Sequence, residues 1–157
     1  LFCVILFIGI KLSDNYGDNI MAHEVHWLIP DHVLFNKYFE VAHGDDTVGV
    51  LEKNLLLTGA TDNTFYIVLD LKDVTTVHTS FGRVPQLLNI ARTFLRNPRL
   101  KFIVAYGAHN QSMKFLATIV MQVTQTNIRF VQTYDDALDF LILQDPSLTS
   151  KIEALCG

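Results

Sequence analysis

The sequence predicts an α/β domain, and three neighbouring segments carry that prediction. Phe65 to Leu69 is a short apolar run of β-branched and aromatic residues, typical of a strand buried on both faces of a parallel sheet. From Val84 to Leu95 the apolar residues recur at helical spacing, so that one helix face can turn inward. Leu100 to Tyr106 is a second strand of the buried kind. Helices that alternate with buried strands indicate βαβ units.

Length and composition bound the domain and its setting. The 157 residues suffice for one domain with a sizeable core, and a 50% hydrophobic, 18% charged composition excludes a disordered chain. The net charge of -4 gives no general attraction to nucleic acid, and we interpret the basic stretch from Arg83 to Lys101 as a solvated helix face. Cys3 and Cys156 form neither a disulfide framework nor a metal-ligand spacing, which favours a reducing, cytoplasmic setting.

The N-terminal segment is interpreted separately from the domain. Leu1 to Ile10 is nearly unbroken in its apolar character, but it has about half of the roughly 20 residues that a membrane-spanning helix needs. Met21 is the first methionine, and we expect residues 1–20 to be a non-native or disordered extension that the domain does not need for folding. A truncated membrane anchor is the competing interpretation. The expected domain covers residues 21–148, followed by a tail over 149–157.

Two strand-like runs, His23 to Pro30 and Val33 to Val41, flank the turn Pro30-Asp31-His32 and predict a hairpin. Polar residues interrupt the second run, so the hairpin is expected towards a sheet edge. His23 and His26 are three residues apart on a strand and point to opposite faces, so no metal site is predicted there.

A helix is predicted from Val48 to Thr58, with Gly59 as its C-terminal stop. Its inward residues are expected to be Val48, Leu51, Leu55 and Leu56.

The helix Gln111 to Gln125 is apolar on more than one face. It either covers the core alone or also forms a homodimer or partner surface. Ile128 to Gln132 is expected to be a short strand, and Thr133 to Asp136 has the spacing of a capping box that opens another helix. Ser147 to Gly157 is interpreted as a polar, partly disordered tail.

The expected functional surface lies beyond the carboxyl ends of the strands, where open α/β sheets bind ligands and partners. This places it in the loops Lys72 to Gly82 and Gly107 to Asn110. Its candidate partner or ligand residues are Asp70, Asp73, His78, Phe81, Arg83 and His109. Neither G-x-G-x-x-G after a strand nor G-x-x-x-x-G-K-[ST] occurs, so no nucleotide cofactor is predicted.

Ser80 is the most informative residue of the first loop. Together with His78 and Asp73 it could be imagined as a catalytic triad, but residues crowded into one loop rarely reach triad geometry. A simpler role is that Ser80 or Thr79 caps the following helix. A phosphate on Ser80 would also be tolerated, because helix N-H groups and Arg83 could receive its charge.

The layout resembles the STAS superfamily, most closely its SpoIIAA-like branch of anti-sigma factor antagonists. The resemblance covers about Glu24 to Leu148 and is carried by Val68 to Thr75 and by Tyr134 to Leu141. In the antagonists an Asp-Ser-Ser-Gly segment follows the central strand, and a partner kinase phosphorylates its second serine. The matching segment here is His78-Thr79-Ser80-Phe81, which puts Ser80 at the phospho-acceptor position, with His78 in place of the acid and Phe81 in place of the glycine.

The resemblance implies a mixed sheet of about five strands with helices packed mainly on one side. It also implies work by binding a protein partner or, in some members, a lipid or nucleotide. We therefore rank a protein-binding regulatory module first, a small-ligand or lipid-binding module second and an enzyme third. The partner could be a kinase or another regulator. No cofactor, metal ion, nucleic acid or membrane span is predicted.

Overall fold

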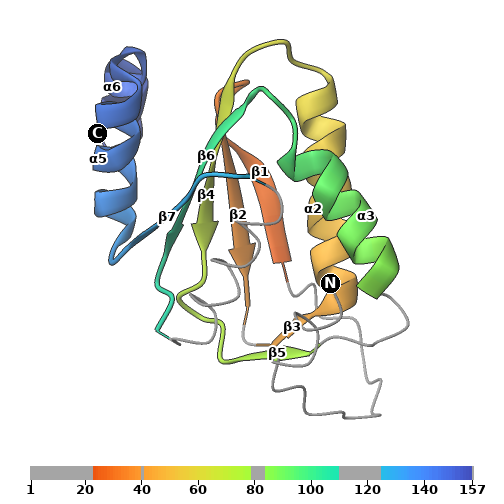
Figure 1. Cartoon of the computed structure of the whole chain (residues 1–157). Coiled ribbons are helices and arrows are strands. Elements are labelled where there is room, and N and C mark those ends of the chain that lie inside the picture. Colours follow the sequence, from red (N-terminus) through yellow and green to blue (C-terminus); the bar gives the residue numbers. More distant parts are fainter. Residues whose placement is uncertain (1–22, 40, 79–83, 110–124, 157) are drawn as a thin grey trace.

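A mixed five-stranded sheet forms the centre of the chain (Figure 1). The computed structural model describes residues 23–39, 41–78, 84–109 and 125–156. The strands, in their spatial order, are β1 (His23–Ile29), β2 (Val33–Tyr38), β4 (Phe65–Asp70), β6 (Leu100–Tyr106) and β7 (Ile128–Val131). Only β1 and β2 are antiparallel, and the other three neighbouring pairs are parallel. The predicted α/β class and mixed sheet are therefore confirmed.

The predicted hairpin is confirmed as β1 and β2, with β1 at the end of the strand order. Asp31 adopts a left-handed backbone with φ of 62°, a conformation that aspartate tolerates better than most residues. The amide of His32 donates to the carbonyl oxygen of Ile29 at 3.0 Å, which closes the turn. Strand β4 lies between β2 and β6, and its first four residues are buried, as its unbroken apolar run predicted.

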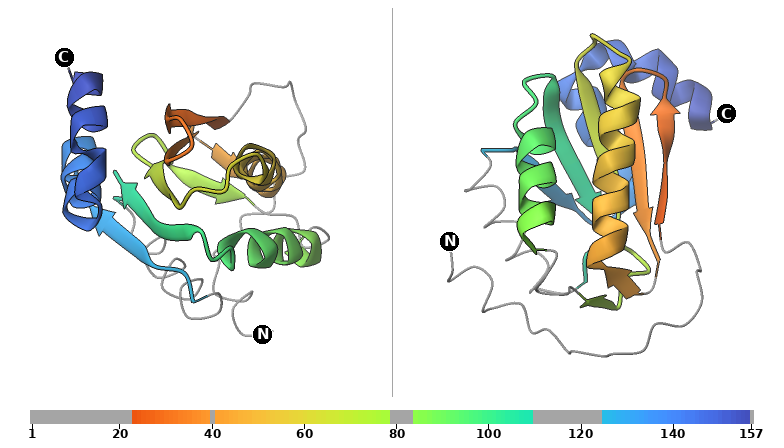
Figure 2. Two further views of the ribbon diagram at one scale, coloured as in Figure 1. Left: turned by 90° about the horizontal axis from the view of Figure 1, so that it is seen from above. Right: turned by 90° about the vertical axis from the view of Figure 1, so that its right-hand side faces the viewer.

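Helices cover both faces of the sheet (Figure 2). On one face α2 (Gly44–Gly59) and α3 (Val84–Leu95) bury Leu51 and Phe94 against Phe65 and Ile67 of β4. On the other face lie α5 (Tyr134–Gln144), the 3-10 turn η2 (Pro146–Leu148) and α6 (Thr149–Cys156). The expectation of helices mainly on one side thus differs from the described part of the chain, where both faces are occupied.

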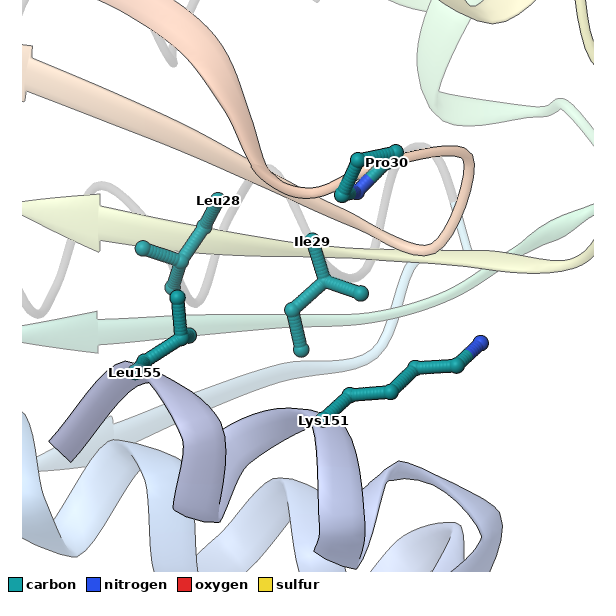
Figure 3. Close-up of a pocket in the computed structure, with 5 residues that line it drawn as sticks. All are labelled: Leu28, Ile29, Pro30, Lys151 and Leu155. Carbon is teal, nitrogen blue, oxygen red and sulfur yellow. The ribbon is translucent and has the colours of Figure 1, made fainter. Parts of the chain in front are cut away.

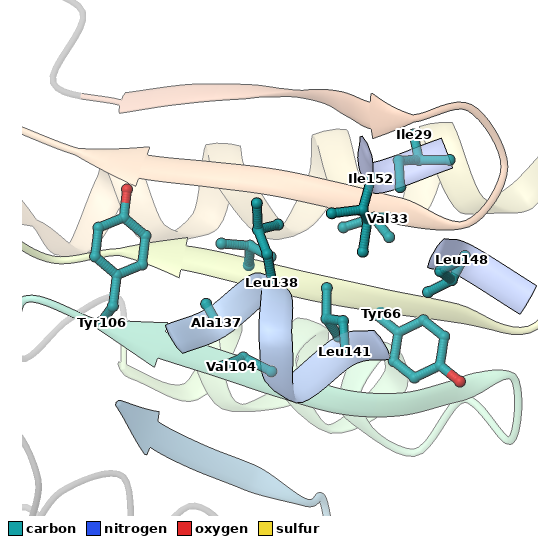
Figure 4. Packing of buried hydrophobic residues seen from close by; sticks show 11 residues of the cluster. Ile29, Val33, Tyr66, Val104, Tyr106, Ala137, Leu138, Leu141, Leu148 and Ile152 are labelled. Carbon is teal, nitrogen blue, oxygen red and sulfur yellow. The ribbon is translucent and has the colours of Figure 1, made fainter. Parts of the chain in front are cut away.

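The second face is closed by one apolar cluster (Figure 4). Ala137, Leu138 and Leu141 of α5 pack on Val68 and its neighbours in β2, β4 and β6. Leu148 of η2 and Ile152 of α6 extend this cluster, with 0% and 3% of their surface exposed. The interpretation of Ser147 to Gly157 as a partly disordered tail is therefore wrong for residues 147–156. Two apolar residues of that segment, Leu148 and Ile152, are four positions apart and enter the cluster together, a spacing that a composition argument overlooks.

The α2 helix corrects one predicted core position. Leu56 is 76% exposed, whereas Asn54 is buried with 1% exposure. Successive helical residues are separated by about 100°, so a face through Leu51, Asn54 and Thr58 turns Leu56 towards solvent. Its predicted end at Gly59 is confirmed. A small parallel pair, β3 (Val41–His43) and β5 (Thr76–His78), was not predicted.

The capping box that opens α5 is confirmed. The amide of Asp136 donates to Thr133 Oγ1 at 3.1 Å, and the amide of Thr133 donates to Asp136 Oδ2 at 2.9 Å. The side-chain contact with Thr133, followed by the backbone bond, lowers the pKa of Asp136 below its ordinary value of 3.8. A carboxylate of lowered pKa stabilises the fold above its unfolded pKa, and that contribution is lost as pH falls through the folded pKa.

We expect the Asp136→Asn variant to lose stability less steeply than wild type as the pH falls below about 4. Thermal unfolding followed by circular dichroism over that range measures the slope. Asp139→Asn, which removes an exposed carboxylate of the same helix that takes no part in the cap, is the control and should keep the wild-type slope. Parallel slopes for wild type and Asp136→Asn would contradict the linkage.

Candidate functional site at the carboxyl edge of the sheet

Three adjacent strands end in chemically distinct residues at the carboxyl edge, the edge at which β2, β4 and β6 finish. Lys37 of β2 pairs in register with Asp70 of β4, and Asp70 pairs with Tyr106 of β6. Residues in register on neighbouring strands point to the same face, so the three side chains form a row on the α5 side of the sheet. We call Lys37, Asp70 and Tyr106 the carboxyl-edge row.

Asp70 is the centre of the row and is only 4% exposed. Its Oδ1 accepts the amide hydrogen of Lys72 at 2.9 Å, and its Oδ2 lies 3.8 Å from the ammonium of Lys37. The hydroxyl of Tyr106 hydrogen-bonds the same carboxylate, and burial followed by this bond raises the pKa of Tyr106. These contacts satisfy a charge that would be costly to bury alone. Asp70 therefore fixes the start of the loop after β4.

Lys37 is held by a second carboxylate as well. Its Nζ lies 3.0 Å from Asp73 Oδ2, and this hydrogen bond is the main cause that raises the pKa of Lys37. Asp73 comes from the loop after β4, so the ion pair ties that loop to the end of β2. The Lys37 ammonium is consequently engaged by acidic groups on two sides.

The loops after β4 and β6 touch at Gly107. Gly107 has φ of 72°, and a Cβ placed on it would lie 2.6 Å from Lys72 Cα. The amide of Leu71 donates to the carbonyl oxygen of Tyr106 at 3.0 Å. Glycine is required here because both the left-handed backbone and the close approach exclude a side chain. The first residues of the two loops, Lys72 and Gly107, therefore lie together at the carboxyl edge.

The predicted site residues fall into two groups. Asp70 and Asp73 belong to the network just described, His109 is exposed in the loop after β6, and His78 is the last residue of β5, opposite His43. Outside the described residues lie Thr79, Ser80, Phe81 and Arg83, and also most of the predicted helix Gln111 to Gln125.

An open hollow of about 300 Å³, here called the aromatic hollow, lies beside the row. It is lined by His26, Leu28, Phe35, Tyr106 and Tyr134. The Tyr134 ring meets Phe35 edge-on, with 6.4 Å between centroids, and Tyr106 at 64° and 5.7 Å. The sequence analysis did not identify this set, since its members come from β1, β2, β6 and α5 and only the strand register brings them together.

A second hollow, of about 390 Å³, lies between the end of β1 and α6 (Figure 3). Its walls are Leu28, Ile29, Pro30, Lys151 and Leu155. They are apolar apart from the Lys151 ammonium.

Two features of the described residues bear on function class. No group of three or more His, Cys, Asp or Glu side chains in this part of the chain could hold a metal ion. No helix within the described ranges has the length and apolar character needed to cross a bilayer.

Comparison with known proteins identifies the fold. No protein-family model matches the chain, and no curated protein matches it significantly. A solved structure does match: an uncharacterised protein of the DUF3478 family from Shewanella loihica PV-4, described as having a SpoIIAA-like fold. The two chains share 16% identity with a TM-score of 0.56, over 81% of this chain and 99% of the other. The chain therefore has a SpoIIAA-like α/β fold, as the resemblance in the sequence implied.

Proposed function

We propose that the chain is a non-enzymatic regulatory module that binds a protein partner through the carboxyl edge of its sheet. The observation that carries the proposal is the way Asp70 and Gly107 hold the loop after β4. Asp70 Oδ1 accepts the Lys72 amide, Asp70 Oδ2 faces the Lys37 ammonium of β2, and Gly107 packs on Lys72. The exposed side chains of Lys72 and His109 stand on the resulting platform. A rigid base with exposed loops suits recognition. A reducing cytoplasm, favoured by the two distant cysteines, is the proposed setting.

SpoIIAA-like antagonists bind a partner kinase, which supports a kinase or another regulator as the partner here. Ser80 is the residue at which this partner would regulate the chain. Ser80 has two candidate roles: phosphorylation by the partner, and plain capping of the helix that follows the loop, by Ser80 or Thr79. A charge at Ser80 would alter partner binding in the first role and would leave it unchanged in the second.

The test is quantitative binding of a partner recovered with the whole chain. Lys72→Glu reverses one exposed charge on the platform, and we expect it to weaken binding by about tenfold or more. Asp139→Asn, which changes an exposed charge of α5, serves as the matched control and should bind like wild type. Unchanged binding by both Lys72→Glu and a His109→Glu variant would place the partner surface elsewhere and contradict the proposal.

Two further variants separate the roles of Ser80. Phosphorylation predicts that Ser80→Asp abolishes binding that Ser80→Ala retains. Capping predicts that both variants bind equally while Ser80→Ala costs about 1 kcal/mol of stability. Equal binding by the two variants would rule out the switch.

The aromatic hollow favours a second candidate function, a small-ligand or lipid-binding module. Its mostly apolar walls are usual for a ligand site, and its volume of about 300 Å³ is at the lower end of the usual range. Native mass spectrometry of the purified chain, with and without cell extract, distinguishes the candidates. A bound small mass favours the ligand, whereas a protein-sized addition favours the partner.

A further inference from the structure

The aromatic hollow has walls that suit a positive charge. Phe35, Tyr106 and Tyr134 present three rings in different orientations around one space. The face of an aromatic ring carries the negative part of its quadrupole and attracts cations within about 6 Å. Tyr106 also hydrogen-bonds the Asp70 carboxylate through its hydroxyl, which brings a negative charge close to one wall of the hollow.

The charges next to the hollow have the complementary sign. Asp70, Asp73 and Glu24 all act on Lys37 at the end of the row. Three carboxylates therefore surround the single ammonium of Lys37, at the end of the row that shares Tyr106 with the hollow. Glu24 also lies 3.1 Å from the ring nitrogen of His26, which lines the hollow.

An anionic ligand is disfavoured by the same contacts. Lys37 is the ammonium of the row, and Asp70 and Asp73 already engage it. The positive end of α5, where Tyr134 begins the helix, is occupied by the protein's own acids, because Asp136 closes the cap and Asp135 lies in the first turn. An added carboxylate or phosphate would meet repulsion from each side.

We propose that the aromatic hollow binds a small organic cation of the ammonium class. The rings would replace the water around the cation, and the neighbouring carboxylates would balance its charge. An open hollow of about 300 Å³ has room for a trimethylammonium head. This inference rests on the second candidate function and specifies its ligand.

The test compares choline with its neutral isostere 3,3-dimethylbutan-1-ol. The two differ in charge and hardly in shape, so the difference in their affinities isolates the cation. Titrations of the whole chain followed by NMR, at constant ionic strength and about pH 8 to keep an ordinary histidine neutral, give both dissociation constants. We expect choline to bind about 3- to 30-fold more tightly and to shift the Phe35, Tyr106 and Tyr134 resonances.

Matched variants locate the effect. Tyr134→Leu removes a ring but keeps an apolar wall, so the preference for choline should fall to near one. Phe140→Leu makes a comparable change on the same helix, where Phe140 packs on Phe102 and does not line the hollow, and should preserve the preference. Asp73→Asn should reduce it. Retained amide dispersion in each spectrum verifies that the variants are folded.

Two results would overturn the inference. If the neutral isostere bound the hollow as tightly as choline or more tightly, the ligand would not be an ammonium cation, but the small-ligand function would remain possible. Failure of choline to shift the three aromatic resonances would remove the cation site altogether, and together with an unliganded native mass it would also remove the small-ligand function. Neither result bears on the protein-binding proposal, which depends on Lys72 and His109.

Discussion

Replacement of Gly107 by alanine is expected to destabilise the chain by about 2 to 4 kcal/mol. The left-handed backbone at φ of 72° would become strained, and the new methyl group would lie 2.6 Å from Lys72 Cα. That neighbour is backbone, so a loop must move to admit the methyl group. Urea denaturation of the variant and wild type measures the loss of unfolding free energy.

Gly59→Ala is the matched control for Gly107→Ala. A Cβ on Gly59, the last residue of α2, meets nothing within 4 Å, so stability should change by less than about 1 kcal/mol. If the Gly107 variant were as stable as the Gly59 variant, the two loops would not be locked together.

Gly107→Ala should also weaken partner binding if the carboxyl edge is the recognition surface, because Gly107 contacts Lys72.

Local patterns of the sequence predicted most of the sheet. The hairpin, the buried run of β4 and the capping box of α5 are each decided by residues within a few positions of one another. The amphipathic helix Val84 to Leu95 is confirmed as α3 for the same reason. Such elements depend on spacing and turn chemistry, which can be read without knowing the tertiary structure.

The site was only partly predictable. Asp70 and Asp73 could be selected because polar residues that follow a buried strand lie at its carboxyl end. Lys37 and Tyr106 were missed. In the sequence, Lys37 is only a polar residue that interrupts the apolar run of β2, and Tyr106 is only the last residue of β6. The register of three strands brings them together: Lys37 lies 33 positions before Asp70 in the sequence, and Tyr106 lies 36 positions after it. No local sequence pattern indicates such a pairing.

The α6 helix is the clearest element that the sequence analysis did not predict. Ile152 is the only buried residue among its side chains that the structure describes, and a short segment at the end of a domain is ordinarily frayed. Ile152 nevertheless enters the cluster formed by Leu148, Leu141 and Ile29 (Figure 4). A helix of this length is held by tertiary packing rather than by its own propensity, so its buried residue should be energetically decisive.

Ile152→Ala is therefore expected to destabilise the chain by about 2 to 4 kcal/mol, the usual cost of emptying a fully buried aliphatic site. Leu155→Ala removes a similar side chain from the same helix at a position that is 46% exposed, and it should cost less than about 1 kcal/mol. Urea denaturation of the two variants compares two aliphatic side chains of equal size within one helix. A small loss in both would mean that α6 does not pack on the sheet in solution. A large loss confined to Ile152→Ala would extend the folded domain beyond residue 148 and explain how this terminal segment closes the second face of the sheet.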